Sequence, residues 1–373
     1  MSGIYIHIPY CTKACHYCNF HFSTSFANKV ALIKCILKEI DLQKDYLSDK
    51  NIDTIYFGGG TPSLLNIGEI SQILYLIQKN FNVSNNVEIT LEGNPEDLSL
   101  KKCLELKAVG INRLSIGIQT FNDQLLKWMN RSHSSEEATN SLNAAFEAGF
   151  TNISADLIYG IPFVDHTVLE NDLLQILQFN LPHLSAYCLT IEDKTPFGNL
   201  LKRGTMIPIS DIYSSEQFEK LMNSFSIAGY EQYEISNYAL NKAYSKHNTS
   251  YWQGTHYLGI GPGAHSYNGT TRQWNVSNNN KYINALNDSI IPLEKESLTQ
   301  SQIFNEYIMT RLRTIWGINS DELIKILPDR KETFMQSVEN FISDGMIYKN
   351  KNFITLTQKG KFFADRISSE LFV

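Results

Sequence analysis

The sequence predicts an α/β fold in which a parallel sheet, open or curved into a partial barrel, is covered by helices. Short apolar segments alternate with segments of helical periodicity through residues 4–191. Six such β–α repeats imply parallel crossovers and therefore one parallel sheet. Residues with distinctive chemistry follow the apolar segments, at the strand ends where ligands gather in such sheets.

The six predicted strands are short and apolar, and helices are predicted between them. The strands are expected at residues 4–8, 54–57, 87–91, 113–119, 153–158 and 184–191. The helices are expected at residues 27–46, 67–78, 99–108, 122–129, 134–148 and 168–179. We expect residues 1–277 to form one domain, in which an extension follows the six repeats.

The sequence changes character after about residue 277, where three asparagines interrupt it. Helical segments at 297–327 and 331–344, a short hairpin within 345–356 and a last helix predict a winged-helix-like domain over 278–373. Winged helices often bind DNA, but the net charge is −6 and no basic recognition stripe is present. We therefore expect no nucleic-acid partner.

Composition indicates a protein with a proper core. Hydrophobic residues make up 43% of the chain, and no apolar run approaches membrane-spanning length. The first residues do not resemble a signal peptide. Cys35, Cys103 and Cys188 are scattered among apolar residues, as buried free thiols of a cytoplasmic protein would be. The composition is compatible with peripheral association with a membrane.

Three cysteines follow the first predicted strand. Cys11, Cys15 and Cys18 have C-x3-C-x2-C spacing. A 4Fe-4S cube normally takes four thiolates, so three cysteines would leave one iron open. The alternative is zinc, whose fourth ligand would have to be His16 or His21. The spacing favours the cluster.

The loops after the second and third strands carry groups suited to a polar ligand. Gly58, Gly59 and Gly60 allow a ligand to approach the backbone closely, although a tight turn would use the same residues. Glu92 and Asn94 place a carboxylate and an amide at the same edge of the sheet. A charge at a helix N-terminus is the alternative role for Glu92.

The fourth and fifth strands add polar side chains to that edge. Ser115 and Gln119 interrupt a strand that should otherwise be buried, and buried polar groups need partners, so we expect them to face a polar ligand. Arg131 can pair with a carboxylate in a fork, and Asp156 can bind ribose hydroxyls. For either residue alone, a surface salt bridge explains the sequence equally well.

Taken together, these motifs resemble a known family. The cysteine loop resembles that of radical S-adenosylmethionine (SAM) proteins, in which SAM fills the open iron. The segments 5–9, 58–62, 115–121 and 156–162 resemble the oxygen-independent coproporphyrinogen oxidase group, which contains the HemN oxidases and the HemW-type haem chaperones. The resemblance covers nearly the whole chain, and it implies a radical SAM partial (β/α)6 barrel with a 4Fe-4S cluster. It places the SAM contacts at Tyr5, Tyr17, Gly59, Gly60, Thr61, Glu92, Gln119, Arg131 and Asp156.

Two features distinguish the two branches of this group. HemN oxidases carry a fourth cysteine two residues after the third and a long N-terminal extension, whereas here Phe20 holds that position and the first cysteine is residue 11. Residues 247–252 instead match the H-N-x-x-Y-W motif of HemW-type proteins. Imidazole can bind haem iron, and aromatic rings offer flat faces to a macrocycle. The resemblance implies haem contacts at His247, Asn248, Tyr251 and Trp252.

Alternatives remain for the haem ligand and for the function. His247 taken alone could be an ordinary core histidine, and His256 and His265 are rival ligands. The resemblance implies a haem chaperone that passes haem to acceptor proteins and receives electrons for its cluster from a donor. The alternative is an enzyme that decarboxylates coproporphyrinogen, which Phe20 and the short N-terminus disfavour. A radical SAM enzyme that modifies tRNA would need a basic binding region, which the sequence lacks.

Overall fold

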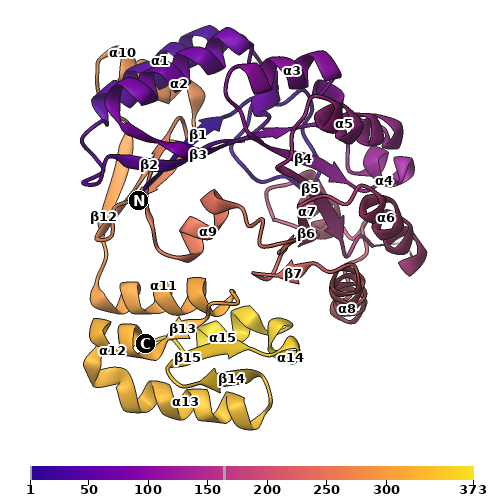
Figure 1. Ribbon diagram of the computed structural model, residues 1–373, viewed down its shortest axis with the longest axis vertical. Helices are drawn as coiled ribbons and strands as arrows, with labels where there is room; N and C mark the ends of the chain where they lie inside the picture. The colour runs from indigo at the N-terminus through magenta and orange to yellow at the C-terminus, as the bar shows by residue number, and fades with distance from the viewer. Residues whose placement is uncertain (1, 163–164) are drawn as a thin grey trace.

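The computed structural model describes residues 2–162 and 165–373. A wide, curved sheet carries helices on its outer face, and a smaller, mainly helical unit lies at one end of the molecule (Figure 1). Within the described residues the sheet has twelve strands, in the order β12-β11-β10-β9-β1-β2-β3-β4-β5-β6-β8-β7. No helix in this part of the chain is long and apolar enough to cross a membrane.

Six parallel strands form the centre of the sheet and pair in sequence order. They are β1 (Ser2–Ile8), β2 (Asn51–Gly59), β3 (Asn82–Gly93), β4 (Arg113–Gln119), β5 (Ile153–Tyr159) and β6 (His183–Cys188). The segments between them contain α1 (Lys29–Leu42), η1 (Pro62–Leu64), α2 (Ile67–Asn80), η2 (Pro95–Asp97), α3 (Leu100–Ala108), α4 (Asp123–Trp128), α5 (Ser135–Glu147) and α6 (His166–Gln178). Each predicted strand overlaps one of these strands, so the predicted partial (β/α)6 barrel is confirmed.

Local sequence explains these elements. In β1, Ile4, Ile6 and Ile8 are fully buried, and alternate residues of a strand share one face, so these three pack as one set. Burying each such side chain stabilises the fold by about 1.5–3 kcal/mol. Helices α2 and α5 begin at Asn66 and Ser134, whose side chains form capping boxes with the third residue of each helix.

Further strands extend both edges of the parallel region. On one side β9 (His256–Ile260) pairs parallel to β1, and β10 (His265–Tyr267), β11 (Thr271–Asn275) and β12 (Leu293–Ser297) follow in antiparallel order. On the other side β8 (Asn237–Ala239) and β7 (Glu231–Gln232) pair antiparallel to β6 and to each other. The connecting helices are α7 (Pro196–Lys202), α8 (Asp211–Ile227), α9 (Lys246–Trp252) and α10 (Asn279–Asn287).

A buried carboxylate fixes the extension to the barrel. Glu39 of α1 is fully buried and accepts hydrogen bonds from the Gly261 amide (2.8 Å), Asn275 Nδ2 (2.6 Å) and the Tyr282 hydroxyl (2.5 Å). Burial raises the pKa of Glu39, and the hydrogen bonds oppose that rise. Since these donors come from the segments after β9, the extension and α1 form one packed unit.

The expected boundary at residue 278 is wrong, because the core does not divide there. Helix α10 packs on α1, and β12 belongs to the main sheet, so the barrel domain continues to about residue 297. The residues that follow have their own hydrophobic core, which includes Phe304, Leu323 and Val338. The three asparagines at the expected boundary instead begin α10, where Asn278 caps the helix.

The C-terminal unit has the element order expected of a winged-helix-like domain. Its elements are α11 (Gln300–Leu312), β13 (Ile318–Asn319), α12 (Ser320–Ile326), η3 (Pro328–Arg330), α13 (Lys331–Ser343), β14 (Ile347–Asn350), β15 (Phe353–Leu356), α14 (Gln358–Lys361) and α15 (Ala364–Glu370). The three strands form a small sheet in the order β13-β15-β14. The helical stretch expected at 297–327 is interrupted at Gly317, whose φ of 65° ends the turn before β13.

Candidate functional site

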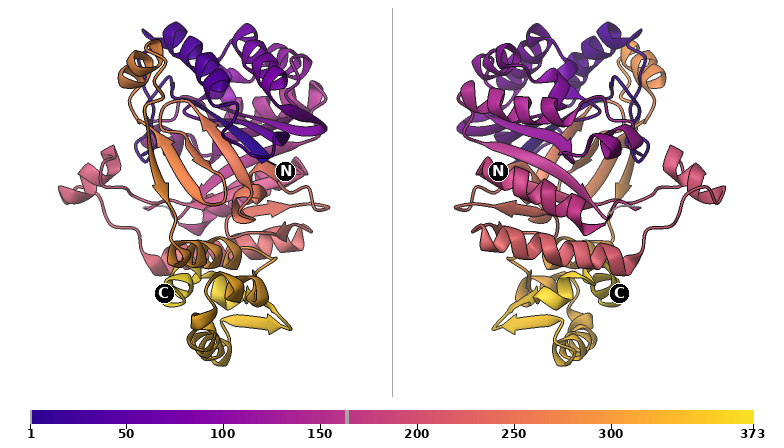
Figure 2. Two further views of the ribbon diagram at one scale, coloured as in Figure 1. Left: turned by 90° about the vertical axis from the view of Figure 1, so that its left-hand side faces the viewer. Right: turned by 90° about the vertical axis from the view of Figure 1, so that its right-hand side faces the viewer.

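The cysteine loop follows β1 and is held by contacts to distant segments. The His16 amide donates to the carbonyl oxygen of Met129 (3.0 Å), and its Nδ1 lies 2.8 Å from the Trp128 carbonyl oxygen. Phe197 of α7 is fully buried, packs on the Trp128 ring at 4.2 Å and donates its amide to the His16 carbonyl oxygen (3.0 Å). In Figure 2, the segment that carries α7 extends beyond the sheet. These contacts fix the loop over the ends of the strands.

Each of the two histidines considered as zinc ligands has one ring nitrogen in a hydrogen bond to another group. His16 uses Nδ1 as described, and His21 Nε2 lies 2.8 Å from Asn279 Oδ1. Among the described residues, no three His, Cys, Asp or Glu side chains converge on the position of a single metal ion. Within the described part of the chain, neither histidine therefore joins the cysteines in a group that could hold one zinc ion.

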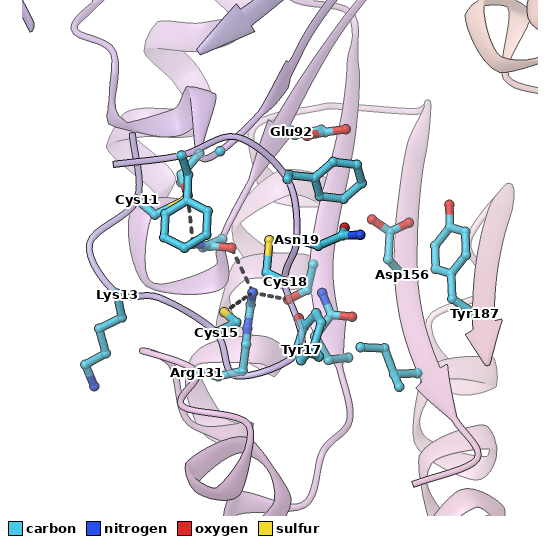
Figure 3. Close-up of a pocket in the computed structure, with 18 of the residues that line it drawn as sticks. Cys11, Lys13, Cys15, Tyr17, Cys18, Asn19, Glu92, Arg131, Asp156 and Tyr187 are labelled. Carbon is cyan, nitrogen blue, oxygen red and sulfur yellow. Dashed lines mark hydrogen bonds between the residues drawn. The ribbon is translucent and has the colours of Figure 1, made fainter. Parts of the chain in front are cut away.

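Cys11, Cys15 and Cys18 all line one cavity of about 490 Å³ (Figure 3). Two of the thiols accept hydrogen bonds, Cys11 Sγ from Thr61 Oγ1 (3.4 Å) and Cys15 Sγ from Arg131 Nη1 (3.5 Å). In Figure 3, Asp156 lies across the cavity from the cysteine loop. Thiols therefore line one side of the cavity, and the ends of the strands line the other.

The glycine-rich loop brings β2 very close to this cysteine loop. A Cβ on Gly60 would lie 2.8 Å from the carbonyl oxygen of Ile8 and 2.7 Å from that of Tyr10. The Gly60 amide donates to the Ile8 carbonyl oxygen at 2.9 Å. Gly59 adopts φ 106°, a left-handed conformation that favours glycine. Close backbone packing therefore requires glycine at position 60, and the left-handed conformation favours glycine at position 59.

Glu92 ends β3 at the wall of the cavity. Its carboxylate accepts hydrogen bonds from the Tyr56 hydroxyl (2.7 Å) and the Gly59 amide (3.2 Å). Burial raises the pKa of Glu92 to about 7, and the nearby Asp156 carboxylate adds to the rise. Burial also raises the pKa of Asp156, against the effect of Arg113. The cavity thus contains two carboxyl groups that would gain from a cationic or hydrogen-bonding ligand.

Arg131 occupies the space between the cysteine loop and the strand ends. Its Nη2 donates to Asn94 Oδ1 (2.8 Å) and to the Gly117 carbonyl oxygen (2.9 Å). Its Nε is buried and has no hydrogen-bond partner among the described residues. A buried guanidinium nitrogen without a partner costs free energy, so Arg131 has a donor to offer to a ligand.

Eight of the nine predicted SAM contacts line this cavity, and Tyr5 does not. The eight are Tyr17, Gly59, Gly60, Thr61, Glu92, Gln119, Arg131 and Asp156. Tyr5 lies deeper in the barrel, where its hydroxyl is 3.1 Å from His7 Nδ1 and its ring stacks on Tyr56. Ser115, which was also predicted to face a ligand, lines the cavity. Three lining residues were not predicted: Asn19 directly after the cysteine loop, Tyr187 near the end of β6, and Thr190 just after it.

His247 does not reach either the cavity or the surface. It is 1% exposed, and its ring nitrogens lie 2.8 Å from Thr54 Oγ1 and 2.8 Å from the Tyr251 hydroxyl. Thr54 precedes Gly59 by five residues, so His247 is about 16 Å below the rim of the barrel. Helix α9 lies inside the curve of the sheet (Figure 1). Neither ring nitrogen of His247 is free to bind iron in this structure.

A second hollow of about 710 Å³ lies beside the first, between the extended edge of the sheet and α11. Asn19 and Phe20 line both hollows. Tyr251 and Trp252 of the H-N-x-x-Y-W motif line the second hollow, whereas His247 and Asn248 do not. Of the two rival histidines, His265 lines this hollow and His256 does not.

The cysteine loop, the six parallel strands and the cavity at their ends define a radical SAM protein. The model of the radical SAM superfamily matches residues 5–174. The radical SAM family carries a 4Fe-4S cluster and SAM, and so does this chain. The solved structure of coproporphyrinogen III oxidase (HemN) from Escherichia coli has the same fold, with a TM-score of 0.86 at 22% identity over 100% of this chain and 90% of that one.

Among such proteins, the chain belongs to the HemW family. It is 32% identical to the haem chaperone HemW of Bacillus subtilis, over 98% of each chain. It is also 32% identical to HemW of Haemophilus influenzae, over 100% of this chain and 97% of that one. The family resemblance of the sequence motifs is therefore confirmed.

Proposed function

We propose that the protein binds haem and passes it to acceptor proteins, and that the cavity of about 490 Å³ holds its cluster and SAM. The full-length similarity to proteins named haem chaperones carries this proposal. Phe20 supports it further, because it stands where the oxidase branch has a fourth cysteine and is 69% exposed at the mouth of both hollows.

The residues of the cavity suit a cluster held by Cys11, Cys15 and Cys18. The three thiols face one space, and they come from a loop that the rest of the fold immobilises. Hydrogen bonds from Thr61 and Arg131 reach two of the sulfur atoms, and such bonds tune cluster potentials. When bound, the cluster and SAM supply one-electron chemistry that the side chains themselves cannot perform.

Side chains around the cavity match the parts of SAM. Glu92 offers a carboxylate to the amino group, and the Gly59-Gly60 backbone lies beside it. Arg131 offers its free Nε to the carboxylate of SAM. Asp156, which lies across the cavity, is suited to the ribose hydroxyls (Figure 3). These roles are proposals that rest on the placement of the groups around one cavity.

Partners and compartment follow from the same proposal. We propose an external electron donor and haem-acceptor proteins as partners. We also propose a cytoplasmic location, because Cys35 and Cys103 are buried free thiols, which persist in reducing compartments. Cys188 was expected to be buried too, but it is exposed.

The second candidate function is coproporphyrinogen oxidation. It is considered because eight of the nine predicted SAM contacts line one cavity, as a radical enzyme would require. The test is a parallel incubation of the anaerobically reconstituted protein with haem, and with coproporphyrinogen, SAM and a reductant. We expect saturable haem binding and no more decarboxylated product than the Cys15→Ala variant forms. Turnover comparable to that of a HemN oxidase would contradict the proposal.

A further inference from the structure

The second hollow has the size and walls of a site for a large, flat ligand. Its volume of about 710 Å³ lies within the range of small-molecule and cofactor sites. Tyr251, Tyr257 and Tyr267 line it, and the Tyr251 and Tyr257 rings meet edge to face at 4.6 Å. One face of α11 covers the opposite side, where Ile303 and Tyr307 stand one helical turn apart.

Three imidazoles line this hollow, and they differ in their free ring nitrogens. His7 uses both nitrogens, one toward the Tyr5 hydroxyl (3.1 Å) and the other toward the His21 carbonyl oxygen (2.9 Å). His21 uses Nε2 toward Asn279. Neither ring nitrogen of His265 has a hydrogen-bond partner among residues 2–162 and 165–373. Either nitrogen can therefore present its lone pair to a ligand while the other carries the proton.

The ring of His265 is held in place from behind. His265 and Trp274 are directly paired between β10 and β11, and their rings stack with centroids 6.0 Å apart and planes 27° apart. An imidazole fixed in this way needs less ordering when it binds a metal, which favours ligation.

Two arginines, Arg272 and Arg311, line the hollow together with one carboxylate, Glu306. Arg272 of β11 forms an ion pair with Glu306 of α11 at 2.6 Å, and its side chain is 35% exposed. Arg311 donates to the Gln253 carbonyl oxygen at 2.9 Å. Guanidinium groups bind carboxylates in a fork, so a ligand with carboxylate arms would compete with Glu306 for Arg272.

We propose that the second hollow is the haem site, that His265 binds the iron, and that Arg272 and Arg311 bind the propionates. This proposal rests on the proposed haem-binding function and names its site. Haem combines the required features, since it is flat and apolar in its plane, carries two carboxylates and accepts an axial imidazole. In this assignment, His247 is a positioning residue that holds the Tyr251 ring through its hydrogen bond of 2.8 Å.

The test is a titration of the full-length, reconstituted protein and its variants with ferric haem, followed by the Soret band. We expect His265→Ala to weaken haem binding by about tenfold or more and to shift the Soret band. Added imidazole should restore the band, because it replaces the missing ligand. His256→Ala is the matched control, since His256 lies on the neighbouring strand outside the hollow, and it should behave as wild type.

The remaining variants separate a ligand from a positioning residue. His247→Ala should weaken binding but keep the wild-type Soret band. A wild-type Soret band in His265→Ala would overturn the assignment of His265 as the iron ligand. So would loss of the wild-type Soret band in the single variant His247→Ala or His21→Ala. SAM affinity and the melting temperature of each variant show whether it still folds. Absence of saturable haem binding in the wild-type protein would instead contradict the proposed function itself.

The propionate contacts are tested with haem and its dimethyl ester. Arg272→Gln should weaken the binding of haem by about tenfold, because a charge-assisted hydrogen bond is lost. The same variant should bind the uncharged ester as tightly as the wild-type protein does. Arg366→Gln on α15 is the control, since Arg366 does not line the hollow and pairs with Glu370 at 2.7 Å. Equal loss for haem and ester would overturn the propionate assignment.

Discussion

Replacing Glu92 by glutamine separates the charge of this carboxylate from its shape. In the unbound protein, burial raises the pKa of Glu92 to about 7, from 4.5 for a free side chain. A raised carboxyl pKa means that stability is lost as the pH rises through 7, because the native state then has to hold the charged form. A cationic amino group of a ligand beside Glu92 reverses the preference for the protonated form, because its charge stabilises the carboxylate.

The magnitudes follow from that pKa. A rise from 4.5 to about 7 corresponds to about 3 kcal/mol at pH 8, and solvent in the open cavity reduces it. Glutamine removes this cost but deprives the Tyr56 hydroxyl or the Gly59 amide of a charged acceptor, at about 1 kcal/mol. The unbound Glu92→Gln variant should therefore be about 1–2 kcal/mol more stable than wild type at pH 8 and nearly unchanged at pH 5.

SAM affinity should change in the opposite direction. If only the carboxylate form binds, the affinity of the wild-type protein falls about tenfold from pH 8 to pH 6. The variant should bind about tenfold more weakly at pH 8 and lose this pH dependence. Asp156, Tyr56 and Arg113 face the same group and are unchanged in the variant, so the difference reports Glu92.

Anaerobic calorimetric titration at pH 6 and 8, together with chemical unfolding of the unbound forms, provides the assay. Glu105→Gln, the same change on the outer helix α3, is the control and should leave both quantities at the wild-type level. Equal SAM affinity at the two pH values in the wild-type protein would refute the role of Glu92. So would wild-type affinity in Glu92→Gln at pH 8.

Three further changes test the site and its support. Alanine at any one of the three loop cysteines should abolish cluster absorbance after anaerobic reconstitution, whereas Cys35→Ala should leave it intact. Gly60→Ala should lower the melting temperature and the cluster yield, because its Cβ would meet backbone oxygens at 2.7–2.8 Å, and Gly68→Ala on the exposed side of α2 should do neither. Glu39→Ala should destabilise the fold by about 3–5 kcal/mol in urea unfolding, because the three donors named above and Gln43 Nε2 lose their buried acceptor; a loss below 1 kcal/mol would contradict that role.

The barrel and most of its cavity were predictable because they depend on local patterns. The apolar segments are short, the helices between them carry capping residues, and the ends of parallel strands must meet at one edge. Asp156 and Glu92 could therefore be assigned to one site from their position after a strand. Tyr5 could not be excluded in this way, because its depth below the rim depends on where β1 pairs with β2.

The second hollow was harder to predict from the sequence than the first cavity. From the sequence motif, His247 was expected to contact a ligand. In the structure, the interior of the barrel supplies hydrogen-bond partners for both of its ring nitrogens, Thr54 Oγ1 and the Tyr251 hydroxyl, so the side chain is buried. His265 and Arg272 come together through the hairpin of β10 and β11. The sequence does contain a signal for that hairpin, the Asn268-Gly269 pair. The packing of α11 against the sheet, which closes the hollow, has no local signal.

This radical SAM fold should hold haem as a bound cargo. The most direct measurement is an equilibrium titration of the anaerobically reconstituted wild-type protein with haem, read at the Soret band and by quenching of tryptophan fluorescence. We expect saturation at one haem per chain, with an imidazole-type band that remains when SAM is added. A linear, unsaturable increase in absorbance, or binding only to protein that has lost its fold, would contradict it.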